Sequence, residues 1–276
     1  MSQSVVYFDD ETGEISPFFG RVYTQDQIEA YEKIKANEPH QRKYEEFIWI
    51  LFHYGEKLFP NVDKASLTRL IFIATFIDKS KESTENRLTD NRGKDFFTKK
   101  EVKQVLKLSD TCFDSFWNEM INNKIFVLNQ NNEVVINDKM FQYGKIDELN
   151  ENRIRLYCGA IRRLYVRCPA RQHKLLGYIF RIIPFVSKEY NIICYNPEEK
   201  DANLIRPMTL EKLCEIIDYD KSNIRRLLKD ILSIQIEGQQ LVKYVSDGTL
   251  NTSYLVVNPK AYYAGYHTTE ISVLFN

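Results

Sequence analysis

Residues 254–266 read YLVVNPKAYYAGY, and residues 133–145 read EVVINDKMFQYGK. In both stretches an apolar strand is followed by Asn, one residue, Lys, four residues and Gly. An offset of 121 relates Asn137 to Asn258 and Lys139 to Lys260. A motif that recurs in this way predicts that the chain contains one structural unit twice.

The match continues upstream at an offset of 111, where Thr98 and Thr209 are predicted helix N-caps. Apolar residues then recur in both copies at the spacing of one helix face. The aligned pairs are Val102 and Leu213, Leu106 and Ile217, Phe113 and Ile224, Phe116 and Leu227, and Met120 and Ile231. Each copy therefore predicts a helix, a tight break, a second helix and a hairpin, and the second copy has ten more residues before its last strand.

A further helix is expected before each copy, at residues 66–78 and 171–186. Three helices closed by a hairpin form a winged helix-turn-helix domain. We therefore expect an α+β protein that is mainly α with small β wings, built from two tandem winged helix-turn-helix domains joined by a basic helical connector. The expected divisions are residues 1–61 (acidic hairpin and helices), 62–147 (first winged helix), 148–167 (connector helix) and 168–276 (second winged helix).

Three local expectations accompany this division. The acidic stretch YFDDETGEI, residues 7–15, predicts a strand, a turn and a strand. Residues 25–37 and 44–59 are expected to be helices. Gly144 and Gly265 are expected to leave the repeated motif with a positive φ.

The net charge of zero conceals an uneven distribution. Residues 152–188 contain nine Lys and Arg and no Asp or Glu, so the rest of the chain carries a net charge of −9. Such asymmetry suggests one surface for a polyanion.

The second copy has the composition of a DNA-reading helix, because its outward positions are basic or amide-bearing. The first copy has Asp110, Asp114 and Glu119 in the equivalent helix, which phosphates would repel. The predicted DNA contacts of the second copy are Lys221, Ser222, Asn223, Arg225, Arg226 and Lys229, with Lys243 added from its wing.

The connector adds predicted phosphate contacts, since no acidic residue of its own helix can pair with its cations. These are Arg155, Arg162, Arg163, Arg167, Arg171 and Lys174. The alternative is that they pair with the acidic N-terminal region or with the acidic face of the first copy.

The sequence contains few motifs that indicate catalysis or the binding of a cofactor or metal. It lacks a P-loop, a dinucleotide-binding glycine motif, a zinc-protease motif and a nucleophile elbow. Its five Cys and four His show no zinc spacing, so we expect reduced thiols, no metal and no cofactor. No apolar run is long enough to span a membrane and the N-terminus does not read as a signal peptide, so we expect a cytoplasmic protein that is not an enzyme.

The duplicated units, the basic connector, YFDDETGEI and VVNPKAYYAG (residues 256–265) together resemble the winged-helix Rep-type replication initiators of plasmids and phages. The resemblance implies that the second copy is the stronger reader of double-stranded DNA and that the first serves dimerisation. Phage transcriptional regulators use the same parts, so initiator and regulator both remain open. We expect a homodimer, with a possible protein partner on the first copy.

A different class of function is also open. The acidic first copy and the neutral total are compatible with a protein–protein adaptor or inhibitor that uses winged helices without nucleic acid.

Overall fold

The computed structural model describes residues 6–8, 15–17, 46–80, 85–90, 93, 95–143, 152–246, 253–265, 271 and 274–275. The fold mixes α-helices with small antiparallel sheets, in agreement with the expected α+β class. Near the N-terminus β1 (Val6–Phe8) pairs antiparallel with β2 (Ile15–Pro17), as expected, and the predicted turn between them lies outside the described residues. The expected helix at residues 25–37 and the glycine at position 144 lie outside the described residues. Within the described ranges no helix has the length and apolarity needed to cross a membrane.

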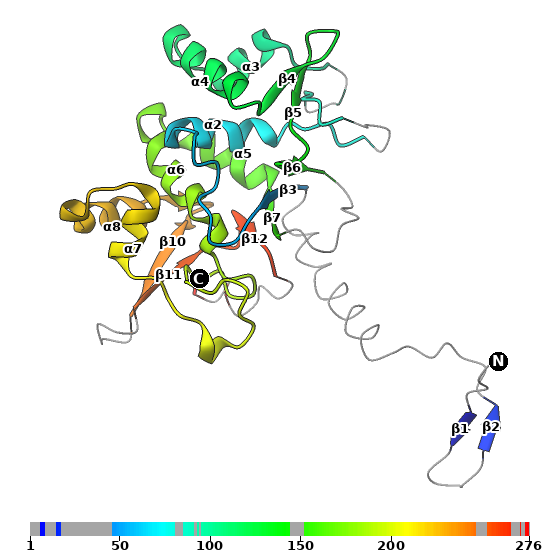
Figure 1. Cartoon of the computed structure of the whole chain (residues 1–276), viewed down its shortest axis with the longest axis vertical. Coiled ribbons are helices and arrows are strands. Elements are labelled where there is room, and N and C mark those ends of the chain that lie inside the picture. Colours follow the sequence, from blue (N-terminus) through cyan, green and yellow to red (C-terminus); the bar gives the residue numbers. More distant parts are fainter. Residues whose placement is uncertain are drawn as a thin grey trace.

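The first unit begins with a strand. Its elements are β3 (Phe47–Phe52), α2 (Lys64–Ala74), α3 (Lys99–Leu106), α4 (Asp110–Asn122), β4 (Phe126–Leu128), β5 (Val134–Ile136) and β6 (Phe141–Gln142). A further short strand around Arg87 pairs with Val135, so β5 lies between this segment and β4. This unit forms the upper part of the molecule in Figure 1.

The second unit follows the same order, with an additional helix, α5, and several extra short elements. They are β7 (Asn152–Tyr157), α5 (Cys158–Arg167), η1 (Ala170–Gln172), α6 (His173–Arg181), η2 (Ile183–Phe185), η3 (Ala202–Leu204), α7 (Leu210–Ile217), η4 (Lys221–Asn223), α8 (Ile224–Leu232), β8 (Gln235–Ile236), β9 (Gln239–Gln240), β10 (Val242–Val245), β11 (Tyr254–Val257) and β12 (Tyr262–Tyr263). Ile192 bridges Val256, so β11 lies between this segment and β10. The second unit therefore repeats the strand order of the first.

One four-stranded antiparallel sheet joins the two units, in the order β12-β7-β3-β6. Its two central strands come from different units and pair along their whole length, from Phe47 opposite Tyr157 to Phe52 opposite Asn152. Each unit adds its own last strand outside, β6 to β3 and β12 to β7. The order therefore reads the same from both edges.

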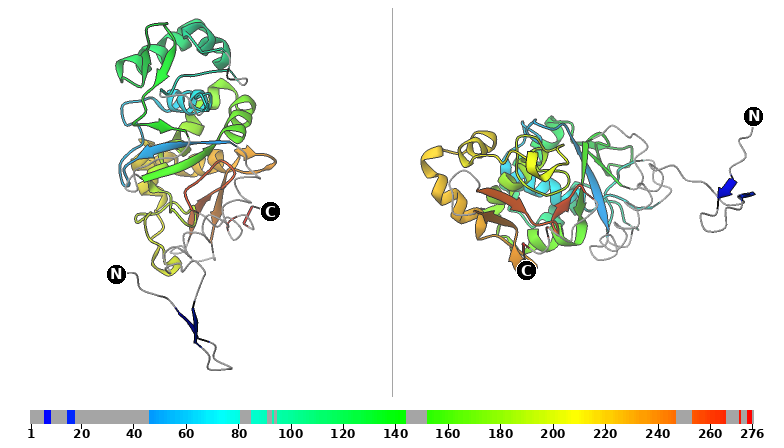
Figure 2. Two further views of the ribbon diagram at one scale, coloured as in Figure 1. Left: turned by 90° about the vertical axis from the view of Figure 1, so that its right-hand side faces the viewer. Right: turned by 90° about the horizontal axis from the view of Figure 1, so that it is seen from below.

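Helices α2 and α6, which precede the helix-turn-helix segments of their units, pack directly on each other. A Cβ added to Gly177 would lie 1.9 Å from the carbonyl oxygen of Lys64, so only glycine permits this approach. The Thr68 hydroxyl donates to the carbonyl of His173 over 2.7 Å, and Arg181 donates to the carbonyls of Phe59 and Val62. Figures 1 and 2 show α2, α5 and α6 as a middle layer between α3 and α4 on one side and the four-stranded sheet on the other.

The helix-turn-helix segments correspond residue by residue at the predicted offset of 111. Thr98 and Thr209 are both N-caps with side-chain hydrogen bonds, and the helices end on Lys107 and Asp218, both left-handed. A residue other than glycine in that conformation is uncommon, so its occurrence at equivalent positions is a strong sign of one shared geometry.

The ten extra residues of the second unit enter at two places. The offset is 116 at the second strand, where Phe126 corresponds to Val242, and 121 at the third, where Ile136 corresponds to Val257. The first insertion forms the β8–β9 hairpin, and the second lengthens the turn between β10 and β11.

The repeated Asn-x-Lys motif is a backbone clamp. The Asn137 side-chain amide donates to the carbonyl of Lys124 (3.3 Å), and that of Asn258 donates to the carbonyl of Gln240 (3.0 Å). In both copies the Asn side-chain oxygen accepts from the amide of the following Lys over 3.0 Å. The clamp turns the chain from the third strand of each unit into the outer strand of the shared sheet.

Gly265 does not have the positive φ that we expected. Glycine instead allows close packing at this position, because an added Cβ would lie 2.5 Å from the Tyr263 hydroxyl and 2.7 Å from the Lys188 carbonyl oxygen.

Two expected helices are wrong in part. Residues 47–52 form β3, and the connector begins with six residues of strand before α5 starts. All six residues of β3 are aromatic or aliphatic, β7 alternates Arg with Ile and Leu, and both strands lie between two partners in the sheet, which favours extended structure. The expected break near Pro169 is confirmed, because α5 ends at Arg167.

Candidate nucleic-acid interface

The start of helix α8 is fixed by side-chain hydrogen bonds of Asp220 and by a left-handed residue, Asp218, in the turn before it. Asp218 ends α7 in the left-handed conformation, and the Asp220 carboxylate accepts from the amide and hydroxyl of Ser222 at 2.9 and 2.8 Å. These bonds begin η4, which continues into α8. Lys57 and Lys64 of the first unit form ion pairs with Asp218, so the turn before α8 is anchored to the other half of the molecule.

As the sequence predicts, α8 has one apolar face that packs on the core and one polar face that is exposed. Leu227 and Ile231 are buried, and Ile224 and Leu228 pack on the core. The residues predicted to contact DNA from this helix are all exposed: Lys221, Ser222, Asn223, Arg225, Arg226 and Lys229.

Some of these cations already have partners. Lys221 pairs with Glu215 at 2.5 Å, which raises the pKa of Lys221, while Lys221 and Lys212 together lower the pKa of Glu215 to about 2. Arg226 lies 3.8 Å from Asp230, and its side chain is 78% exposed. Arg225 and Lys229 have no ion pair with any described residue. Both are therefore available to an external anion.

A second exposed group of cations lies where α5 bends into α6. We call residues 166–174 the basic elbow. Arg167, Arg171 and Lys174 are exposed and make no ion pair within the described part of the chain. Three unneutralised cations on one bend suit a phosphate backbone.

Arg163 stands next to this elbow and is half-exposed, but it is paired with Glu237. Glu237 has a φ of 52° beside Gly238 in the β8–β9 turn, and its carboxylate also lies 3.6 Å from Lys260. The hairpin inserted in the second unit therefore supplies an acid that the sequence analysis did not assign to Arg163.

Two predicted phosphate contacts are wrong. Arg155 is 4% exposed, and its guanidinium donates to the carbonyl of Gly265 at 2.8 Å. Arg155 lies in β7 rather than on a helix, and its guanidinium lies over the ring of Trp49. A buried arginine with an internal acceptor cannot contact a phosphate without unfolding its surroundings.

Arg162 is also committed inside the protein. Its guanidinium donates to the Thr75 hydroxyl (2.9 Å) and carbonyl (2.6 Å) and lies 3.9 Å from the centre of the Phe76 ring. Burial lowers the pKa of this guanidinium. Its cation thus ties α5 to the end of α2, through a hydroxyl and a carbonyl rather than through the acidic residues of the alternative.

Lys243 is only partly exposed, and its ammonium group donates to the carbonyl of Leu274 near the C-terminus. Its predicted contact with DNA would require the loss of this bond.

The acidic residues of α4 are paired within their own unit. Lys103 lies 2.8 Å from Asp110, and Lys99 lies 3.2 Å from Asp114. At the offset of 111 these acids occupy the places of Lys221 and Arg225. The equivalent helices thus present opposite charges at their first two outward positions, although the lysines of α3 moderate the charge of α4.

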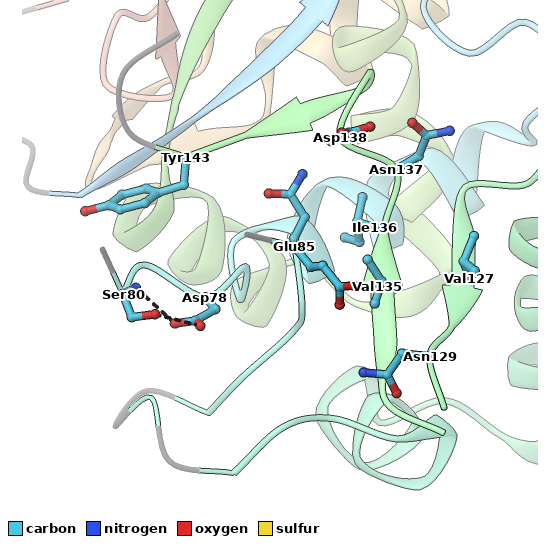
Figure 3. Close-up of a pocket in the computed structure, with 11 residues that line it drawn as sticks. Asp78, Ser80, Glu85, Val127, Asn129, Val135, Ile136, Asn137, Asp138 and Tyr143 are labelled. Carbon is cyan, nitrogen blue, oxygen red and sulfur yellow. Dashed lines mark hydrogen bonds between the residues drawn. The ribbon is translucent and has the colours of Figure 1, made fainter. Parts of the chain in front are cut away.

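The first unit also contains a groove that the sequence analysis missed. This acidic groove, of about 460 Å³, runs beside β4 and β5. Figure 3 shows Asp78 and Ser80, joined by a hydrogen bond, on one side and Val127 and Val135 on the other. No local motif marks it, because its lining comes from separate segments: Asp78, Ser80, Glu85, Asn86, Val127, Asn129, Val135, Ile136, Asn137, Asp138 and Tyr143.

Catalytic chemistry gains no support from these groups. Among the described residues no three His, Cys, Asp or Glu side chains lie together as metal ligands would. Burial raises the pKa of Cys168 and of Cys194 to about 11, so neither thiol is activated as a nucleophile. No family model, curated protein or solved structure matches this chain.

Proposed function

We propose that the two units are tandem winged helices and that the chain is a cytoplasmic, sequence-specific binder of double-stranded DNA. The observation that carries this proposal is the outward face of α8. It places Arg225 and Lys229, which have no ion pair with any described residue, beside Asn223 on a helix whose apolar face is packed. In a helix-turn-helix that face enters the major groove, where Arg reads guanine and Asn reads adenine.

The basic elbow supplies the second contact in this proposal. Arg167, Arg171 and Lys174 bind phosphates on the flanking duplex and set the position of the protein without reading sequence. With Arg155 and Arg162 removed from the predicted set, these three and Arg163 are what remains of the connector cations.

An origin-binding initiator and a transcriptional regulator of a phage or plasmid both fit this arrangement. A homodimer would bind two half-sites related by its own symmetry. The competing proposal is an adaptor that binds protein rather than DNA. It is favoured by one finding, the internal use of Arg155, Arg162 and Lys243.

The test is fluorescence anisotropy of labelled duplex DNA across a salt series. We expect affinity for random duplex to fall steeply with salt. Arg167→Ala with Arg171→Ala weakens binding to all sequences alike and lowers the log–log salt slope by about 2. Arg225→Ala with Arg226→Ala costs about 1–3 kcal/mol per lost base contact at a selected site.

Lys99→Ala with Lys100→Ala is the matched control, because it removes two exposed cations from α3, outside the proposed interface. It should leave the affinity close to that of the wild type. If no duplex binds even at low salt, the DNA proposal fails and the adaptor remains.

A further inference from the structure

The basic elbow includes an apolar side chain that is exposed to solvent. Val166 is 76% exposed, more than any other exposed large hydrophobic residue of the described chain. It lies out of phase with Ile161, Leu164 and Tyr165, which form the buried stripe of α5. A single exposed valine is ordinary, but this one is followed by Arg167 and lies in a segment, residues 152–188, that contains no acidic residue.

The acidic groove has the opposite composition. Its lining includes the carboxylates of Asp78, Glu85 and Asp138, and it contains no Lys or Arg. Val127 is 53% exposed and Tyr143 is 40% exposed, and Leu128, next to Val127 on β4, is 42% exposed. Three of the seven exposed large hydrophobic residues of the described chain thus lie in or beside this groove.

The two surfaces cannot meet within one molecule. In Figure 1 α6, which begins in the elbow, lies to the left, and β4 and β5 lie to the right. Within the described part of the chain no ion pair connects the cations of the elbow with the carboxylates of the groove.

We propose that the basic elbow of one copy docks in the acidic groove of a second copy. Val166 contacts the apolar lining around Val127 and Tyr143, and Arg167 and Arg171 lie against the carboxylates at its margins. The charges are complementary, which favours encounter and fixes orientation. The occupant is a second copy of this chain because the elbow has the unpaired cations that the groove lacks and an exposed apolar residue to match the exposed apolar residues of the groove.

This contact joins two different surfaces and is therefore head-to-tail. Such an interface leaves one groove and one elbow unused at the ends, so association continues beyond a dimer unless a ring closes. It also occupies the cations that we propose for DNA. Duplex DNA and a second copy then compete for the elbow, although the docking itself does not depend on DNA binding.

The test uses two charge-reversal variants and analytical ultracentrifugation at low ionic strength. The elbow variant is Arg167→Glu with Arg171→Glu, and the groove variant is Glu85→Lys with Asp138→Lys; all four positions are exposed. For the wild type we expect a mass that rises with concentration and falls when salt is added. Each variant alone stays at the mass of one chain, because its elbow and groove have the same sign.

The decisive sample is an equal mixture of the two variants. Its members carry a reversed elbow and a reversed groove that attract each other, so association returns. The matched control is Arg225→Glu with Arg226→Glu, which makes the same charge change on α8 and should associate as the wild type does. This control loses DNA binding if the proposed function holds, so the two proposals fail independently.

Three results would overturn the docking: a wild-type mass that does not change with concentration, variants that associate as strongly as the wild type, or a mixture that stays monomeric. Circular dichroism of each variant verifies that it is folded.

Discussion

His173 is a buried imidazole that the fold holds in its neutral form. It is 3% exposed, and its Nδ1 atom has no hydrogen-bond partner. Burial, aided by the nearby Arg69 cation, lowers the pKa of His173 to about 4. The unfolded chain binds a proton on this residue near pH 6.5, whereas the folded chain does not. Stability from this group is therefore complete above pH 6.5 and is lost as pH falls towards 4.

We expect the free energy of unfolding to fall by about 2 kcal/mol from pH 7 to pH 5 because of this residue. Urea unfolding at the two values measures the loss. His173→Gln should remove most of the pH dependence in this window, where aspartates and glutamates are ionised in both states. An equal fall in wild type and variant would assign the effect to another group.

At this scale the sequence predicts surface residues of regular helices well and buried cations poorly. The periodicity of α8 places Arg225 and Lys229 outside correctly, because four apolar residues fix the orientation of the helix. The same reasoning assigns Arg155 and Arg162 to phosphates, although both donate to acceptors inside the protein. Their acceptors, Gly265 and Thr75, are distant in the chain, and only the tertiary structure brings them within reach.

Among the contacts between elements, the contact between α2 and α6 tolerates substitution least. Gly177 lies so close to the backbone of Lys64 that any side chain would force the helices apart. The turn before α8 depends on the same contact, because Lys64 also pairs with Asp218. A disturbance here should reach both the stability of the core and the position of α8.

Gly177→Ala is expected to lower the free energy of unfolding by about 3 kcal/mol or more, since overpacking in a close-packed core displaces backbone. Chemical denaturation measures this change. Lys174→Ala, one turn earlier on α6 and exposed, should shift stability by less than about 0.5 kcal/mol. Similar small effects for both variants would contradict the close approach of the helices.

The two helices of each helix-turn-helix segment could be predicted because each has an apolar stripe and the first of each pair has a capping threonine. Thr98 and Thr209 mark starts that need no tertiary information. Residues 47–52 were assigned to a helix because a short apolar run has no distinctive period. Their strand form depends on pairing with β6 and β7, which follow far along the chain.

For the whole molecule, the shared sheet makes the two units one folding body. β3 has neighbours from both units, and α2 packs on α6 so closely that a Cβ at Gly177 would overlap the backbone of Lys64. Neither unit alone can satisfy the backbone groups of its central strand on both sides, which leaves an exposed edge. The predicted domain limits at residues 62 and 168 would separate β3 and β7 from the units to which they contribute.

We expect one cooperative unfolding transition, with fluorescence and circular dichroism coinciding and the calorimetric enthalpy equal to the van't Hoff value. Residues 62–147 alone should not give a cooperative transition, because they lack β3 and the contact with α6. Two separate transitions in the full chain, or an independently stable fragment, would show that the sheet does not couple the units.

The sheet order that reads the same from both edges has a consequence for ancestry. A single ancestral unit whose central strand paired with its own copy would have built the same sheet from two identical chains. Gene duplication and fusion would turn such a symmetric pair into one polypeptide. Fusion would also release the copies from having to stay identical, so that α8 could become basic while its counterpart α4 became acidic.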